Sequence, residues 1–145
     1  MKLVVKRFDE LTAAQLHKIL KTRVSIFVVE QECPYQEVDD TVCESLHIWL
    51  EENGEIKAYL RLFPKADSEN TAHIGRVLAT ERRKGYATQI LDAGIKVAKE
   101  VMKADRIYLE AQTYALGLYL NRGFAPCGEE FLEDGIPHTP MMKEI

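Results

Sequence analysis

The sequence has 145 residues, of which 46% are apolar and 29% charged, and its formal net charge is −4. These values are typical of a globular protein, and we expect one domain over residues 1–145 with a hydrophobic core of its own. The negative charge argues against nucleic acid as a partner, because phosphate binding needs a broad basic surface, and mildly against an anionic membrane.

The three cysteines, Cys33, Cys43 and Cys127, are odd in number and unevenly spaced, which does not indicate a disulfide framework. Reduced thiols in the cytoplasm are the simpler interpretation. The N-terminal run MKLVVKRFDE is too polar for a signal peptide, and no stretch approaches transmembrane length, so we expect a cytoplasmic protein. Cys43 and His47 have no second matching pair of ligands, so we expect no metal.

The chain is expected to begin with a strand and a helix. Residues 2–8 form a short run rich in β-forming side chains. Thr12 and Gln15 have the T-x-x-Q form of a capping box, which predicts that a helix begins there. Apolar side chains then recur at helical spacing, so we expect the helix to run to about Glu30.

A loop and a hairpin are expected next. Residues 33–45 hold Pro34 and several acids without a clear period, which predicts a loop. Residues 46–51 and 56–63 alternate with period two on either side of Asn53-Gly54. That pattern is typical of two antiparallel strands joined by a tight turn.

The second half predicts a strand at 72–79, an amphipathic helix after Gly85, a strand at 106–112 and a short helix near 114–121 that ends at Gly123. Two final strands, 124–132 and 138–144, flank the turn Asp134-Gly135-Ile136-Pro137. The strand–helix–strand crossover predicts a parallel pair, and the hairpins predict antiparallel neighbours. The predicted fold class is therefore α+β with a mixed sheet.

The strand at 72–79 leads through the basic segment 82–88 (RRKGYAT) into the amphipathic helix. A helix N-terminus offers free backbone N–H groups and a positive dipole, which together favour a phosphate. Gly85 lets the backbone approach a ligand, and Arg82, Arg83 and Lys84 add charge. The alternative is a solvated charge run. Neither a Walker A loop nor G-x-G-x-x-G is present.

The R-x-x-G-x-A pattern at Arg82, Gly85 and Ala87 resembles the coenzyme A motif, [QR]-x-x-G-x-[GA], of the GNAT acetyltransferases. A second motif of the family, N-x-x-A-x-x-x-Y-x-x-x-G-F, has a counterpart at the proper distance; its matching positions are Gln112, Ala115, Tyr119, Gly123 and Phe124. Gln112 departs from the usual Asn, and Arg83 stands where the family often has Gly.

Two further segments, Phe27–Asp39 (FVVEQECPYQEVD) and Asp134–His138 (DGIPH), resemble a small bacterial branch of the family, the ElaA-like acetyltransferases. The resemblance extends over nearly the whole chain. It implies the acyl-CoA N-acyltransferase fold, in which a mostly antiparallel sheet of about seven strands contains a splayed parallel pair and is flanked by helices.

The resemblance also implies a cofactor site for acetyl-CoA between the strands at 72–79 and 106–112. Backbone groups of Val77 and Ala79 would pair with the pantetheine amides in the manner of an added strand. An N–H near Val77 or Leu78 would stabilise the tetrahedral oxyanion. The remaining cofactor-binding residues that the resemblance implies are the amides of Arg83, Lys84, Gly85, Tyr86, Ala87 and Thr88 at the pyrophosphate, together with Arg82 and Gln112.

The implied reaction is direct attack of an amine on the thioester, with Tyr119 donating a proton to the departing thiolate. Packing in the core is the alternative for Tyr119. The residue that removes the amine's proton is not fixed by the sequence. The candidates are Glu110, His73, His138, Glu30 and a water chain.

We expect the acceptor to bind between the loop after the first helix, at Glu30 and Gln31, and the turn that contains His138. Arg23 falls on the apolar stripe of the first helix, where an unpaired charge is unfavourable. It either pairs with a carboxylate under the loop or anchors a substrate carboxylate. The acidic loop 36–44 weakly favours a cationic amine.

The predicted activity is transfer of acetyl from acetyl-CoA to a small-molecule or peptide amine, by a monomer or homodimer. Two alternatives stay open: a transferase of longer acyl chains, as in the related acyl-homoserine lactone synthases, and a CoA-binding module without turnover.

Overall fold

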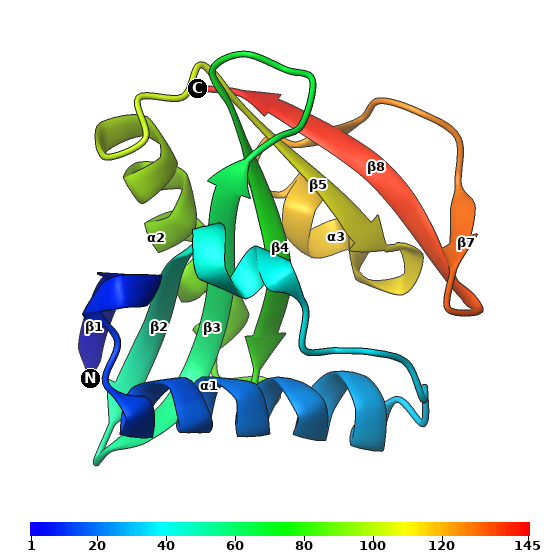
Figure 1. Cartoon of the computed structure of the whole chain (residues 1–145). Coiled ribbons are helices and arrows are strands. Elements are labelled where there is room, and N and C mark those ends of the chain that lie inside the picture. The colour runs from blue at the N-terminus through cyan, green and yellow to red at the C-terminus, as the bar shows by residue number, and fades with distance from the viewer.

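One mixed β-sheet runs through the molecule, with helices on both of its faces (Figure 1). A computed structural model describes all 145 residues. The strands are β1 (Lys2–Arg7), β2 (Leu46–Glu52), β3 (Glu55–Pro64), β4 (Thr71–Ala79), β5 (Arg106–Gln112), β6 (Ala125–Pro126), β7 (Phe131–Glu133) and β8 (Ile136–Glu144). Their order is β1-β2-β3-β4-β5-β8-β6, with β7 also paired to β8, and only β4 and β5 are parallel. The predicted fold class is confirmed.

The first helix, α1 (Ala13–Val24), begins at the predicted capping box. The Gln15 N–H donates to the Thr12 hydroxyl at 3.1 Å, and the Thr12 N–H donates to the Gln15 side chain at 3.0 Å. Beyond Val24 the helix widens into a π-helical segment, η2 (Ser25–Glu30), which ends at the expected residue. No helix in the chain is long and apolar enough to cross a membrane.

Alternation along the central strands divides the core between the two faces of the sheet. Ile48 and Leu60 pack with α2 (Tyr86–Glu100) and α3 (Leu116–Leu120) on one face. Trp49 follows Ile48 in β2, and Tyr59 precedes Leu60 in β3. Both side chains pack with α1 and η2 on the opposite face. The turn at Asn53-Gly54 has positive φ at both residues, as the hairpin pattern predicted.

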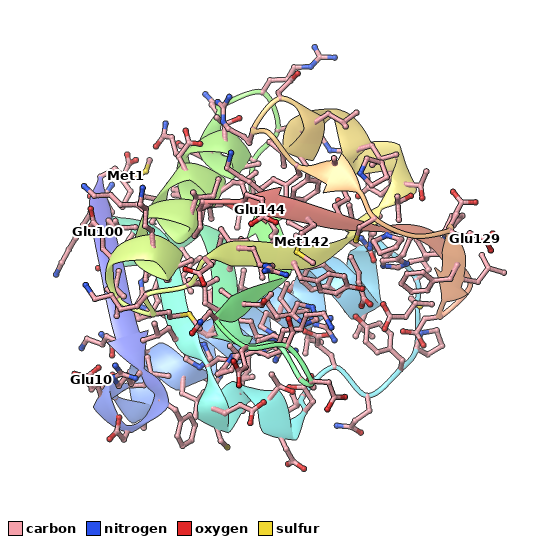
Figure 2. All side chains as sticks on the ribbon, turned by 90° about the horizontal axis from the view of Figure 1, so that it is seen from above. Met1, Glu10, Glu100, Glu129, Met142 and Glu144 are labelled. Atoms are coloured by element: carbon pink, nitrogen blue, oxygen red, sulfur yellow. The ribbon has the colours of Figure 1, made fainter.

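The prediction of one continuous strand at 124–132 is wrong, because the segment divides into β6 and β7. Cys127 donates its N–H to the Pro140 carbonyl at 2.9 Å. Pro140 has no N–H to return, so the ladder stops there. Glu129, in the connection between the two strands, lies at the margin of the molecule in Figure 2, away from Met142 of β8. The count is therefore eight strands.

Two smaller differences concern the predicted loops. Residues 33–45 include a 3₁₀ helix at Asp40–Glu44. Strand β8 begins at Ile136, inside the predicted turn, so the tight turn is limited to Asp134-Gly135, which both have positive φ.

Gly94 of α2 sits where a side chain would collide with the sheet. A Cβ at this position would lie 2.8 Å from Leu60 Cδ2, and Leu60 is completely buried. We expect Gly94→Ala to lower the free energy of unfolding by about 1 kcal/mol, since overpacking of about 1–3 kcal/mol exceeds the helix-propensity gain of about 1 kcal/mol. Urea denaturation measures the change.

Gly117→Ala is the matched control, because Gly117 is also helical and a Cβ there meets nothing within 4 Å. Its stability should be unchanged or slightly higher. A Gly94→Ala protein at least as stable as the parent chain would contradict the proposed close packing.

Candidate active site

A cleft opens where the two parallel strands separate. Pairing of β4 with β5 extends only from Thr71–Arg106 to Ile74–Leu109. Beyond these positions β4 continues along β3, while β5 continues along β8 as far as Gln112. Figure 1 shows the two strands diverging from their starts near the C-terminus of the chain. The end of β4 is therefore left without a partner on its β5 side.

A β-bulge distorts β4 at the point of separation. Tyr59 and Arg61 of β3 are two residues apart, but their partners Leu78 and Gly75 are three apart. Arg76, inside the bulge, has a φ of 54°, which is rare for a residue with a side chain. Such a bulge removes backbone groups from the regular ladder and commonly lies beside an active site.

A cavity of about 770 Å³ fills the cleft and continues past both strands. Residues that the sequence predicted to bind the cofactor and residues that it predicted to bind the acceptor both line this cavity. The predicted residues that line it are Glu30, Gln31, Val77, Leu78, Ala79, Arg82, Gln112, Tyr119 and His138. The structure thus brings the predicted cofactor and acceptor residues around one space.

The predicted pyrophosphate segment lies at the start of α2, next to this cavity. Gly85 is the N-cap, with φ 76° and no side chain capping the first turn. Arg83 also has positive φ, 59°, at the position where the family often has Gly. The N-terminal end of a helix and left-handed residues before it together form a concave set of N–H groups suited to an anion. Six members of the segment, Arg83 to Thr88, do not line the cavity itself.

Tyr119 projects from α3 into the cavity and is nearly buried. Its ring packs edge-on against Phe124 at 6.1 Å between centroids, so the side chain also belongs to the core. Burial, with a smaller contribution from Tyr114, raises the pKa of Tyr119 above its ordinary value. The phenol is therefore protonated at neutral pH and available as a hydrogen-bond donor.

On the far side of the cleft, the predicted acceptor loop touches the end of β5. The side-chain amides of Gln31 and Gln112 exchange two hydrogen bonds, each of 3.2 Å. One Glu30 carboxylate oxygen lies 3.8 Å from Arg82 Nη2 across the same opening, with both side chains largely exposed. Residues predicted for the cofactor and for the acceptor thus meet directly, and a ligand that reached Gln112 would compete with Gln31 for its amide.

Arg23 is completely buried and pairs with Glu37, its Nε lying 2.8 Å from Oε2. This contact matches the first of its two interpretations, an ion pair under the loop. The pair belongs to a larger cluster that the sequence reasoning missed. Arg76 Nε lies 2.9 Å from Glu37 Oε1, and Arg61 binds Asp39 through two hydrogen bonds of 2.7 and 2.9 Å.

The charges of all three arginines act on the Asp39 carboxyl. Burial alone would raise the pKa of its carboxyl, but the hydrogen bond and charge of Arg61, with the charges of Arg23 and Arg76, outweigh burial and lower that pKa. Asp39 is therefore ionised at neutral pH and holds segment 33–45 against β3.

The candidates for the base differ in their surroundings. Burial lowers the pKa of His73 to about 4, which makes it a weak base. His138 donates through Nδ1 to the Ile136 carbonyl at 2.7 Å, and its Nε2 lies 3.7 Å from Glu133. Glu110 lines the cavity from β5 and accepts a 2.9 Å hydrogen bond from the Tyr108 hydroxyl.

No group of three or more metal-ligating side chains is found in the chain. His47, considered above with Cys43, is instead completely buried between the Tyr59 hydroxyl at 2.7 Å and the Val42 carbonyl at 2.8 Å. Both of its ring nitrogens therefore have protein partners.

Comparisons with known proteins agree with the geometry. Residues 12–145 match the family described as acetyltransferase (GNAT) domain. A UPF0039 protein of Schizosaccharomyces pombe is 36% identical over 149 residues, covering 100% of this chain and 98% of the relative. Protein ElaA of Escherichia coli is 35% identical over 141 residues, with coverage of 94% and 92%. The crystal structure of an acyl-CoA N-acyltransferase from Pseudomonas aeruginosa superposes with a TM-score of 0.91, at 33% identity and 99% coverage of both chains.

The start of α2 can be tested with a substitution at Gly85. Gly85→Asp should weaken CoA binding at least tenfold by isothermal titration calorimetry, because it places a negative charge at the predicted pyrophosphate site and strains a residue with φ 76°. Gly54→Asp is the matched control, since Gly54 has the same φ of 76° in the β2–β3 turn and does not line the cavity. Unchanged CoA affinity in Gly85→Asp would show that the pyrophosphate binds elsewhere.

Proposed function

Since the chain belongs to the GNAT acetyltransferase family, we propose that it transfers an acetyl group from acetyl-CoA to a primary amine by direct attack. The observation that carries this proposal is that one continuous cavity extends to both sides of the sheet where β4 and β5 separate. Such a space admits a thioester from one side and an amine from the other. The family's description supports acetyl as the acyl group.

On the cofactor side, the unpaired end of β4 would hold the pantetheine arm. Val77 and Ala79 offer backbone groups on the edge that β5 has left, which suits pairing with an extended ligand. A backbone N–H near Val77 or Leu78, within or next to the bulge, would stabilise the oxyanion. The first turn of α2 would bind the pyrophosphate, with Arg82 beside it.

The proposed chemistry forms the C–N bond and breaks the C–S bond of the thioester. Glu110 accepts a proton from the attacking amine, directly or through a water, because it is the lining carboxylate fixed by a hydrogen bond from Tyr108. Tyr119 donates a hydrogen bond, and in the limit a proton, to the departing sulfur. An unperturbed thiol has a pKa of about 8.5, so partial transfer is sufficient.

The acceptor would enter on the side of η2 and the β7–β8 hairpin. Glu30, Gln31 and His138 line this side and are proposed to contact the acceptor. Arg23 has no exposed surface, so we propose that it acts through Glu37. The partner is thus a small-molecule or peptide amine. A cytoplasmic location and a monomeric or homodimeric state are proposed with it.

The deciding experiment follows release of the CoA thiol from acetyl-CoA in the presence of a library of amines. Amine-dependent release, with the acetylated amine identified by mass spectrometry, supports the proposal. Parallel assays with butyryl-CoA and octanoyl-CoA separate it from a longer-chain transferase. CoA binding without release for any amine would favour the non-catalytic alternative.

Tyr119→Phe should lower kcat about 10-fold or more with little change in acetyl-CoA affinity. The lost hydrogen bond forms chiefly as negative charge develops on sulfur, so the loss appears in the chemical step. Steady-state kinetics and calorimetry measure the two quantities. Equal kcat in the two proteins would remove Tyr119 from the mechanism and leave it a core residue.

Glu110→Gln should lower kcat/KM by about 10²-fold or more at neutral pH, as expected when a general base is lost. The deficit should shrink as pH rises toward about 10, because more of the amine is then already unprotonated. A pH–rate profile measures this recovery. If His138→Gln shows the same loss and recovery while Glu110→Gln does not, the base is His138.

A further inference from the structure

On the proposed acceptor side of the cavity, arginines outnumber the carboxylates that pair with them. Three guanidiniums, Arg23, Arg61 and Arg76, meet only two carboxylates, Glu37 and Asp39. Contacts of 4.0 Å or less between arginines and carboxylates connect the five groups into one cluster. The cluster therefore has a surplus of one positive charge. Burying like charges is unfavourable unless counter-charges balance them.

Hydrogen bonding within the cluster is also incomplete. Arg23 Nη1 and Arg61 Nε are buried and have no partner. Arg23 is 0% exposed and Arg61 4% exposed, so bulk water does not readily compensate either group. The cluster therefore has more positive charges than carboxylates, and more N–H donors than acceptors within the protein.

Arg76 is the most exposed arginine of the cluster, so its guanidinium is open to a ligand. Its side chain is 26% exposed, and it lines the cavity together with Arg61. The guanidinium lies over the rings of Phe27 and Tyr35, at 5.8 and 5.9 Å from their centroids, which fixes its plane. Gly75 gives Arg61 room, since a Cβ there would lie 3.4 Å from Arg61 Nε.

A purely structural role for Arg76 is to neutralise Glu37. Glu37, however, already has Arg23 at 2.8 Å and a hydrogen bond from the Tyr35 hydroxyl at 2.8 Å. Arg76 additionally sits in the strained left-handed conformation of the bulge, beside the residues proposed to bind the thioester. Its placement is better explained by a ligand than by Glu37 alone.

Three further carboxylates line the same cavity. Glu110 on β5, Glu133 at the end of β7 and Asp134 in the hairpin turn all line it. The acids of loop 36–44 that suggested a cationic acceptor include Glu37 and Asp39, but each of these two carboxylates pairs with an arginine. The cavity thus offers both guanidinium and carboxylate groups to a ligand.

We propose that the acceptor is a free amino acid, whose carboxylate binds Arg76 and whose amine faces Glu110. The proposal rests on the proposed acetyl transfer and specifies its substrate class. A guanidinium binds a carboxylate through paired hydrogen bonds, and this geometry distinguishes an amino acid from an amine of the same shape. A peptide N-terminus, which has no carboxylate next to its amine, is the less favoured acceptor.

The test uses matched triads: an amino acid, its amide and its decarboxylated amine, for example phenylalanine, phenylalaninamide and phenethylamine. Triads with small, aromatic and basic side chains are compared at saturating acetyl-CoA, with thiol release as the readout. For at least one triad, kcat/KM for the amino acid should exceed that of its two partners about 10- to 100-fold, the range expected for a charged hydrogen bond. Binding of the same compounds to the CoA-loaded protein is measured by calorimetry.

Arg76→Gln should remove most of this preference by raising KM for the amino acid more than KM for its amide or its decarboxylated amine. Arg76→Lys, which retains the charge, should restore part of the preference and serves as the fallback if Arg76→Gln does not fold. Arg106→Gln is the matched control, because Arg106 contacts Glu144 at 3.9 Å and does not line the cavity.

The two hypotheses fail differently. Acetylation of amides and decarboxylated amines as fast as amino acids, or an unchanged preference in Arg76→Gln, overturns the carboxylate site but leaves acetyl transfer standing. Absence of thiol release with every amine contradicts the proposed function. In that case, carboxylate-dependent binding that Arg76→Gln abolishes would still support the site, and equal binding of the three members of each triad would overturn it.

Discussion

The separation of β4 from β5 is the constraint on which the rest of the site depends. Parallel pairing lasts for four positions and stops at Ile74 and Leu109. Each strand then remains bound to its antiparallel neighbour, so the separation is stable without a ligand. It exposes a strand edge inside the molecule, where edges are normally paired or covered, and an extended ligand is the natural complement to such an edge.

The bulge and the arginine cluster act together at this separation. Arg76 occupies the bulge, and its guanidinium reaches the loop that follows η2 through Glu37. Arg61, on the neighbouring strand, holds the same loop through Asp39. Buried charge therefore helps to fix the loop to the sheet, and Tyr35 and Asp39 of this loop line the cavity. Breaking one partner of such a cluster is costly, which gives the loop a defined position.

Features encoded locally were predictable from the sequence, and features that depend on distant partners were not. The capping box at Thr12 and the Asn53-Gly54 turn are each formed by residues that lie within a few positions of one another, and both were confirmed. Tyr119 was placed by its spacing to Gly123, which does have positive φ. The Arg61–Asp39 and Arg76–Glu37 contacts join residues 22 and 39 positions apart, so no periodicity signalled them.

Two errors have equally physical causes. The strand expected at 124–132 is interrupted because Cys127 meets Pro140, which cannot complete the ladder, and the sequence around Cys127 does not reveal that partner. The bulge at Arg76 was missed because arginine carries no preference for positive φ. At Arg83 the sequence did provide a sign, since the family often has Gly where this chain adopts the same left-handed conformation.

Backbone amide NMR during a CoA titration tests the account most directly, because it reports the ligand residue by residue. The account predicts saturable shifts concentrated at Val77–Ala79 and at Arg83–Thr88, together with the Gln112 side-chain amide as its contact with Gln31 is replaced. Shifts confined to other surfaces, or none at millimolar CoA, would contradict the assignment of the separated strands as the cofactor site.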